Sequence, residues 1–118
     1  MAKLENIIEA LYLHEDPSAV AVLEEVGTNC EAEKVRKLTA RALVKRNTYD
    51  SLKLVISSRG KGVNDLNSEV AMATIDEIIG ITDKTQIMNV INDTINSNPD
   101  NDIRENAMSI RTLIEMSA

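Results

Sequence analysis

Residues 35–43 read VRKLTARAL, and a related pattern returns as VAMATIDEI at 70–78 and IRENAMSIR at 103–111. The three stretches start 35 and then 33 residues apart. Each opens with a β-branched residue and carries a small residue four positions later (Thr39, Thr74 and Ala107), which lets a neighbouring helix approach closely. A period of about 34 residues indicates a structural unit that is repeated along the chain.

Apolar residues recur at spacings of three and four along the whole chain, which predicts amphipathic helices and no sheet. We expect seven helices, over about residues 4–14, 16–26, 29–46, 48–57, 67–80, 82–95 and from about 102 onward. Asn29, Thr48, Asn67 or Ser68, and Thr82 with Asp83 are expected to begin the middle four, and the glycine-containing run 58–62 separates two of them. The inward residues of the last five helices should be Val35, Leu38, Ala42, Leu43; Leu52, Val55, Ile56; Val70, Ala73, Thr74, Ile78, Ile79; Ile87, Met88, Val90, Ile91, Ile95; and Ile103, Ala107, Ile110, Leu113, Ile114.

Two helices per unit of about 34 residues describe a helical hairpin repeat, and here the sequence resembles HEAT-repeat proteins and their armadillo-type relatives. The first helix of that family typically starts after a turn containing Asp and Pro, with Val-Arg followed by small residues. Val35-Arg36 and Ile103-Arg104, the latter after Pro99-Asp100, match this pattern, whereas Val70-Ala71 lacks the arginine. The resemblance covers about residues 31–118. Tetratricopeptide repeats have the same period, but their aromatic and glycine landmarks are missing.

The resemblance implies an all-α fold, a short right-handed α-solenoid of about seven antiparallel helices forming one domain over residues 1–118. A compact helical bundle is the alternative. The resemblance also implies that the second helix of each hairpin lines a concave binding face.

Composition limits the classes of function. The chain has 118 residues with one Cys, one His, two Tyr and neither Trp nor Phe. One Cys and one His exclude a disulfide framework and a Cys- or His-rich zinc module, so we expect no metal and no cofactor. No apolar run approaches the length of a membrane span and no signal-peptide stretch is evident, so we expect a cytoplasmic protein.

The net charge of −6 conceals a segregated pattern. Residues 1–33 sum to −7, residues 34–62 to +8 and residues 63–118 to −7. The central basic segment is either a site that attracts an acidic partner or a layer that neutralises its acidic neighbours within the fold.

No set of residues suggests catalysis. Neighbouring acids such as Glu24-Glu25 point about 100° apart on a helix, and His14 and Cys30 have no evident catalytic partner. The run Arg59-Gly60-Lys61-Gly62 lacks the strand, the helix and the Gly-Lys-Ser/Thr ending of a P-loop. Two tyrosines provide little stacking surface for single strands, and the acidic composition further disfavours nucleic acid.

These observations predict a non-enzymatic module that binds a protein partner, possibly an acidic segment. The binding residues would be the basic patch and the outward face of the second helices: Arg36, Lys37, Lys53, Ser57, Arg59, Lys61, Gln86, Asn89, Asn92 and Asp93, together with Ser51, Thr85 and Asn96. A HEAT-like ligand-handling protein of the chromophore-lyase type is the alternative, and a phosphate or nucleic-acid binder the third.

The last expected helix carries an apolar edge formed by Ile110, Leu113, Ile114 and Met116. We expect that helix either to pack back onto the stack or to pair with another subunit.

Overall fold

The computed structural model describes residues 27 and 29–117, and within them every regular element is helical. The elements are α3 (Glu33–Arg46), α4 (Tyr49–Ser57), the 3-10 helix η2 (Gly62–Asn64), α5 (Ser68–Gly80), α6 (Thr85–Ser97) and α7 (Asn101–Ser117). The all-α prediction is therefore confirmed for this part of the chain. The two helices expected over residues 4–14 and 16–26 lie outside the described residues.

Two of the expected caps are present. The Thr48 side chain accepts a hydrogen bond from the Ser51 backbone N–H, and the Ser51 hydroxyl oxygen accepts one from the Thr48 backbone N–H, which completes a capping box at the start of α4. The Asn67 side chain accepts from the backbone N–H groups of Glu69 and Val70 at the start of α5. Both helices therefore begin where short-range side-chain chemistry predicts.

The expected cap Asn29 is wrong, and of the expected pair Thr82 and Asp83 only Asp83 bonds the start of α6. Before α3, the carbonyl groups of Cys30 and Glu31 accept hydrogen bonds from the Arg36 side chain, and the helix starts only at Glu33. Before α6, the Asp83 carboxylate accepts from the Thr85 backbone N–H, so Asp83 rather than Thr82 satisfies the first turn. In both places a side chain near the helix start, Arg36 or Asp83, forms the hydrogen bonds to the backbone before or at the first turn.

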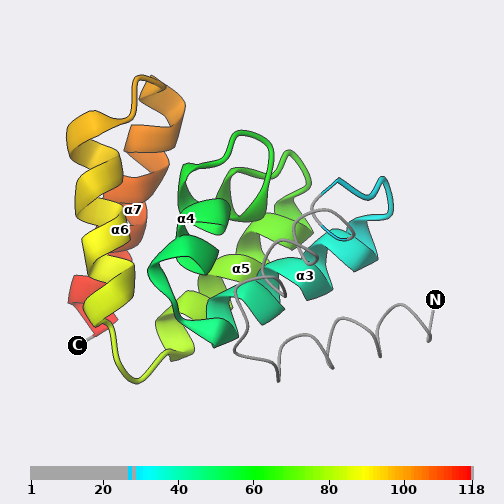
Figure 1. Ribbon diagram of the computed structural model, residues 1–118, viewed down its shortest axis with the longest axis horizontal. Coiled ribbons are helices and arrows are strands. Elements are labelled where there is room, and N and C mark those ends of the chain that lie inside the picture. Colours follow the sequence, from blue (N-terminus) through cyan, green and yellow to red (C-terminus); the bar gives the residue numbers. More distant parts are fainter. Residues whose placement is uncertain (1–26, 28, 118) are drawn as a thin grey trace.

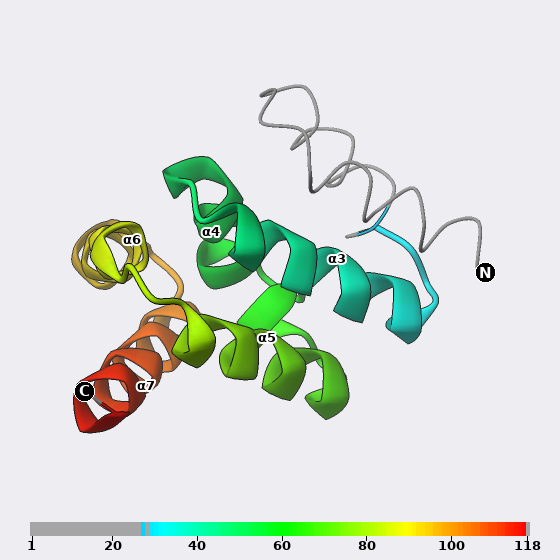
Figure 2. The ribbon, with the colours of Figure 1, turned by 90° about the horizontal axis from the view of Figure 1, so that it is seen from below.

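The helices pack as two stacked pairs closed by α7. α3 contacts α5, α4 contacts α6, and α7 packs mainly along α6. In Figure 1 α3 and α5 lie side by side, while α6 and α7 form the opposite end. Figure 2 shows α6 nearly end-on where α3 and α5 run across the view, so α6 crosses the layer formed by α3 and α5.

The repeated small residues lie at equivalent places in this packing. Thr39 and Thr74 are both fully buried, and each donates its hydroxyl hydrogen to the carbonyl oxygen four residues earlier. Ala107 of α7 is buried as well. The sequence repeat is thus accompanied by equivalent burial in α3, α5 and α7.

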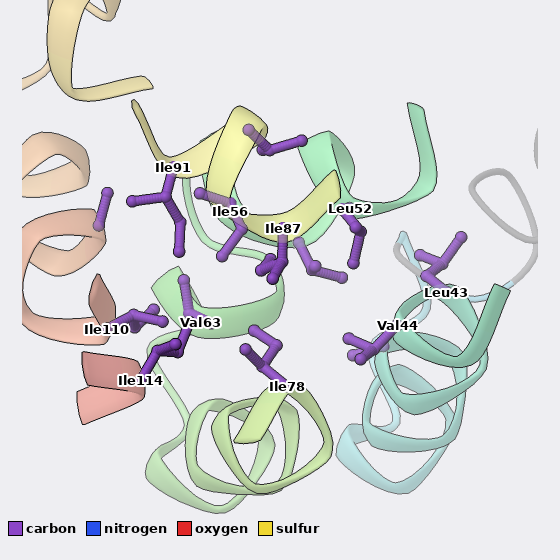
Figure 3. Packing of buried hydrophobic residues seen from close by; sticks show 14 of the residues in the cluster. Leu43, Val44, Leu52, Ile56, Val63, Ile78, Ile87, Ile91, Ile110 and Ile114 are labelled. Carbon is purple, nitrogen blue, oxygen red and sulfur yellow. The ribbon is translucent and has the colours of Figure 1, made fainter. Parts of the chain in front are cut away.

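The core is aliphatic, as the composition requires, and joins side chains from every described helix (Figure 3). η2 adds Val63, which no periodicity predicted, and α3 adds Ala40 and Val44. Most expected inward residues are buried. Leu38, Ala73, Ile79, Met88 and Ile95 are only half-buried, because they lie at the edges of their helix faces.

On α7, Ile110 and Ile114 are buried against the fold, so this helix packs back onto the stack. The expectation that Leu113 points inward is wrong, since its side chain is 39% exposed. The buried line of α7 runs through Ile103, Ala107, Ile110 and Ile114. Leu113 precedes Ile114 by one residue, which turns it about 100° away from that line.

Candidate protein-interaction surface

Arg36, the first residue of the predicted basic patch, is held inside the fold. Its Nε lies 2.9 Å from Oδ2 of Asp65, whose side chain is 2% exposed, and its Nη2 lies 3.3 Å from Oδ1. Its Nη1 also donates to the carbonyls of Cys30 and Glu31. The hydrogen bond to Asp65 raises the pKa of the Arg36 guanidinium. All three nitrogen atoms of this guanidinium are therefore occupied within the chain.

Other bases of the central segment also pair with later acids. Arg41 Nε lies 3.0 Å from a Glu77 carboxylate oxygen, and Lys45 Nζ lies 3.9 Å from the same oxygen. Arg59 Nε lies 3.1 Å from Oδ2 of Asp100. Several bases of residues 34–62 thus form ion pairs with acids of residues 63–118 within the fold.

The predicted basic residues do not form one patch. Arg36 is fixed to Asp65, whereas Lys37 lines a groove of about 570 Å³ between α3 and α5. Arg59 lines a second groove, of about 540 Å³, between the connection after α4 and the start of α7. Lys61 is half-buried in that connection. These residues lie in separate environments because they come from different helices and from a loop.

Neither groove is chemically suited to an anion. The α3–α5 groove is lined by acids of α5 opposite the bases of α3: Lys37 and Arg41 face Glu69, Asp76 and Glu77. The second groove has Asp65, Asp100, Asp102 and Glu105 around the single base Arg59. Since Arg59 is already paired with Asp100, a phosphate would meet mainly carboxylates there.

The outward residues of α4 and α6 lie together. Tyr49, Lys53 and Ser57 follow one line of α4 at steps of four. The Tyr49 hydroxyl donates to Oδ2 of Asp93 over 2.6 Å, and the hydroxyl oxygens of Ser57 and Thr94 lie 2.6 Å apart. Both contacts reach the same turn of α6, and Lys53, between Tyr49 and Ser57 on this line, is exposed.

α6 presents its polar face next to this line. Its exposed residues are Thr85, Gln86, Asn89, Asn92, Asp93 and Asn96, all of which were expected to point outward. We call the exposed residues Lys53, Gln86, Asn89, Asn92, Asp93 and Asn96 the α4–α6 ridge. Ser51, also expected to point outward, is fully buried, because its hydroxyl is engaged in the capping box of α4.

Some ridge residues have partners within the fold and others do not. Asp93 accepts from Tyr49, and Asn92 accepts through Oδ1 from Nη1 of Arg111 on α7. Among the described residues, the amide side chains of Gln86, Asn89 and Asn96 make no hydrogen bond. Each of these three amides exposes both donors and acceptors.

Sequence reasoning missed Tyr49 and Arg111. The contact of Tyr49 with Asp93 joins residues 44 positions apart, and it raises the pKa of the Tyr49 hydroxyl because the hydrogen bond needs its proton. The step of four from Tyr49 to Lys53 and Ser57 is the signal that could have placed Tyr49 on the same face.

Among the described residues, no group of three or more His, Cys, Asp and Glu side chains could hold a metal ion. No described helix has the length and hydropathy needed to cross a bilayer. No protein-family model, no curated protein and no solved structure matches this chain.

Proposed function

We propose that this chain is a short HEAT-like α-solenoid, right-handed, that acts as a protein-interaction module and binds a partner protein through the α4–α6 ridge. Two features support the repeat. α3 packs on α5 and α4 on α6, as successive hairpins of a solenoid do. Thr39 and Thr74 also share burial and hydrogen bonding.

The observation that carries the binding role is the row of amides on α6. Asn lowers helix stability relative to Ala, and solvated helix faces more often carry Glu and Lys. Gln86, Asn89 and Asn96 nevertheless face solvent, and no bond within the described residues accounts for them. Amides that both donate and accept are suited to the backbone and polar side chains of a protein segment.

The basic residues have a smaller part in this proposal than the sequence indicated. Arg36 and Arg59 are paired with acids, so the positive charge at the ridge comes from Lys53. We therefore propose a polar partner segment held by hydrogen bonds, with Lys53 favouring an acidic residue at one position.

The test is quantitative capture from native lysate by immobilised full-length chain. The ridge variant combines Gln86→Ala, Asn89→Ala and Asn96→Ala. The matched control combines Glu69→Ala, Met72→Ala and Asp76→Ala, three exposed residues of α5. We expect the ridge variant to lose proteins that wild type and the control retain, while all three melt cooperatively. Equal recovery by the ridge variant and wild type would overturn the proposal.

A further inference from the structure

α7 carries an uncovered apolar face. Among the described residues, three of the five exposed large apolar side chains belong to this helix, with Met108 at 41%, Leu113 at 39% and Met116 at 78% exposure. Met108 and Met116 lie on the side of α7 away from the buried line through Ile110 and Ile114, and Leu113 lies on the flank between that line and this side. Figures 1 and 2 show α7 at the end of the molecule away from α3.

The equivalent side of the first repeat is covered. With Thr39 aligned to Ala107, Met108 and Thr112 correspond to Ala40 and Val44 of α3. Both α3 residues are buried, at 2% and 0% exposure. The face that α3 buries in the stack is therefore left open on α7.

We propose that a second copy of this chain covers this face through an antiparallel, two-fold contact between the α7 helices. A two-fold contact needs a surface that is complementary to itself. Met108, Thr112 and Met116 are spaced four and four, so their pattern is symmetric about Thr112. In the antiparallel pair Met108 meets Met116 of the partner, and the small Thr112 meets its own copy.

The flanks of this line are also complementary to themselves. Under the same two-fold, each flank of α7 meets the same flank of the partner in reverse order. On one flank, Arg111 approaches the partner's Glu115. Within one chain these two side chains are only loosely paired, with 3.9 Å between Arg111 Nε and Glu115 Oε1. On the other flank Leu113 meets its own copy, which would bury a side chain that the monomer leaves 39% exposed.

Covering this face would leave few polar groups without partners. The hydroxyls of Ser109 and Thr112 already donate to the carbonyl oxygens of Glu105 and Met108, four residues earlier in each case. Their desolvation therefore costs little, because no donor is orphaned. A contact confined to one helix is smaller than a standard interface, so the dimer should dissociate on dilution.

Sedimentation equilibrium of the full chain, from about 10 µM to about 1 mM, tests the dimer itself. We expect wild type to shift from monomer to dimer mass across this range. The double variant Met108→Asp/Met116→Asp should weaken association by about tenfold or more, because it places carboxylates in the apolar line. The control Met72→Asp, at an exposed methionine of α5, should leave it unchanged. A monomer at every concentration, or equal weakening by the control, would refute the proposal.

Charge reversal and cross-linking test the geometry. Arg111→Glu and Glu115→Arg should each weaken the homodimer, and mixing the two variants should restore association, because each mutated residue then meets an opposite charge. In a Cys30→Ser background, Thr112→Cys should form an intermolecular disulfide faster than Asn89→Cys on α6. Absence of rescue on mixing, or equal cross-linking rates, would exclude the antiparallel two-fold arrangement.

Discussion

Arg36 and Arg104 make the same bond: each donates Nη1 to the carbonyl oxygen six residues earlier, Cys30 at 3.0 Å and Asn98 at 2.7 Å. Each arginine follows a β-branched residue, Val35 or Ile103, and fixes the turn before its helix to the first helical turn. They differ in their further bonds, since Nη1 of Arg36 also donates to the carbonyl oxygen of Glu31. Arg36 also bonds the carboxylate of Asp65, which lies in the turn before α5. Arg36 thus joins the start of α3 to the turn before α5, whereas Arg104 bonds only the turn before its own helix.

Arg36→Met should destabilise the protein far more than Arg104→Met. Removing Arg36 leaves the Asp65 carboxylate, 2% exposed, without a cation. The expected loss is about 2–4 kcal/mol in the free energy of unfolding. Removing Arg104 takes away a bond to one carbonyl, for which we expect a loss of about 1 kcal/mol. Urea unfolding measures both.

A double-mutant cycle assigns the cause. Arg36→Met/Asp65→Asn should be less destabilised than the sum of the single variants, because the second change removes the uncompensated charge. Additive losses would show that Arg36 acts through the Cys30 and Glu31 carbonyls alone.

Gly62 should tolerate substitution much less well than Gly60. Both residues have positive φ, 56° and 73°, a region that is unfavourable for L side chains. A Cβ on Gly62 would also lie 2.5 Å from the Val55 backbone, whereas a Cβ on Gly60 would meet nothing within 4 Å. Gly60→Ala should therefore cost about 1 kcal/mol from backbone conformation alone, and Gly62→Ala clearly more. Thermal melts that rank the two variants equally would contradict this account.

Local chemistry was the part of the fold that could be predicted from the sequence. Thr48 and Asn67 cap their helices through atoms two or three residues away, so composition and spacing suffice to find them. The spacing of the apolar residues likewise identified the helices and most of the core. Leu113 was predicted inward because it precedes the buried Ile114, but the spacing of apolar residues does not fix how wide the buried face of a helix is.

The candidate surface was less predictable because long-range pairing decides which charges stay available. Arg36 pairs with Asp65, which lies 29 positions later in the sequence, and Arg59 pairs with Asp100, which lies 41 positions later. Both looked like available cations in the sequence. The α6 amides were identified correctly as outward-facing, since a helix face follows from periodicity.

Acid should destabilise the protein partly through Asp83 and Asp100. Hydrogen bonds from Thr85 lower the pKa of Asp83. Burial opposes ionisation of Asp100, but bonds from the Ile103 and Asp102 N–H groups and the charge of Arg59 outweigh it and lower its pKa. A lowered pKa in the folded state means that the ionised form stabilises the fold above the ordinary value of about 4, and that this stability is lost as pH falls below it.

Asp100→Asn should therefore flatten the decline of stability below about pH 4. The neighbouring variant Asp102→Asn is the matched control, since Asp102 makes no ion pair among the described residues. Urea midpoints measured at several acidic pH values compare the two. Parallel curves for Asp100→Asn and wild type would show that acid acts elsewhere.

Asn89→Ala should make the protein more stable. Asn89 is exposed in the middle of α6 and makes no hydrogen bond within the described part of the chain, so Ala gains helix propensity, about 0.5 kcal/mol. Asn92→Ala is the control: it gains the same propensity but loses the bond to Arg111, so its net gain should be smaller. Denaturant unfolding gives both values. If Asn89→Ala raises stability while the ridge variant loses partner capture, the amide is retained at a cost to folding, as a residue selected for binding would be. A loss of stability instead would indicate that Asn89 has a structural role in α6.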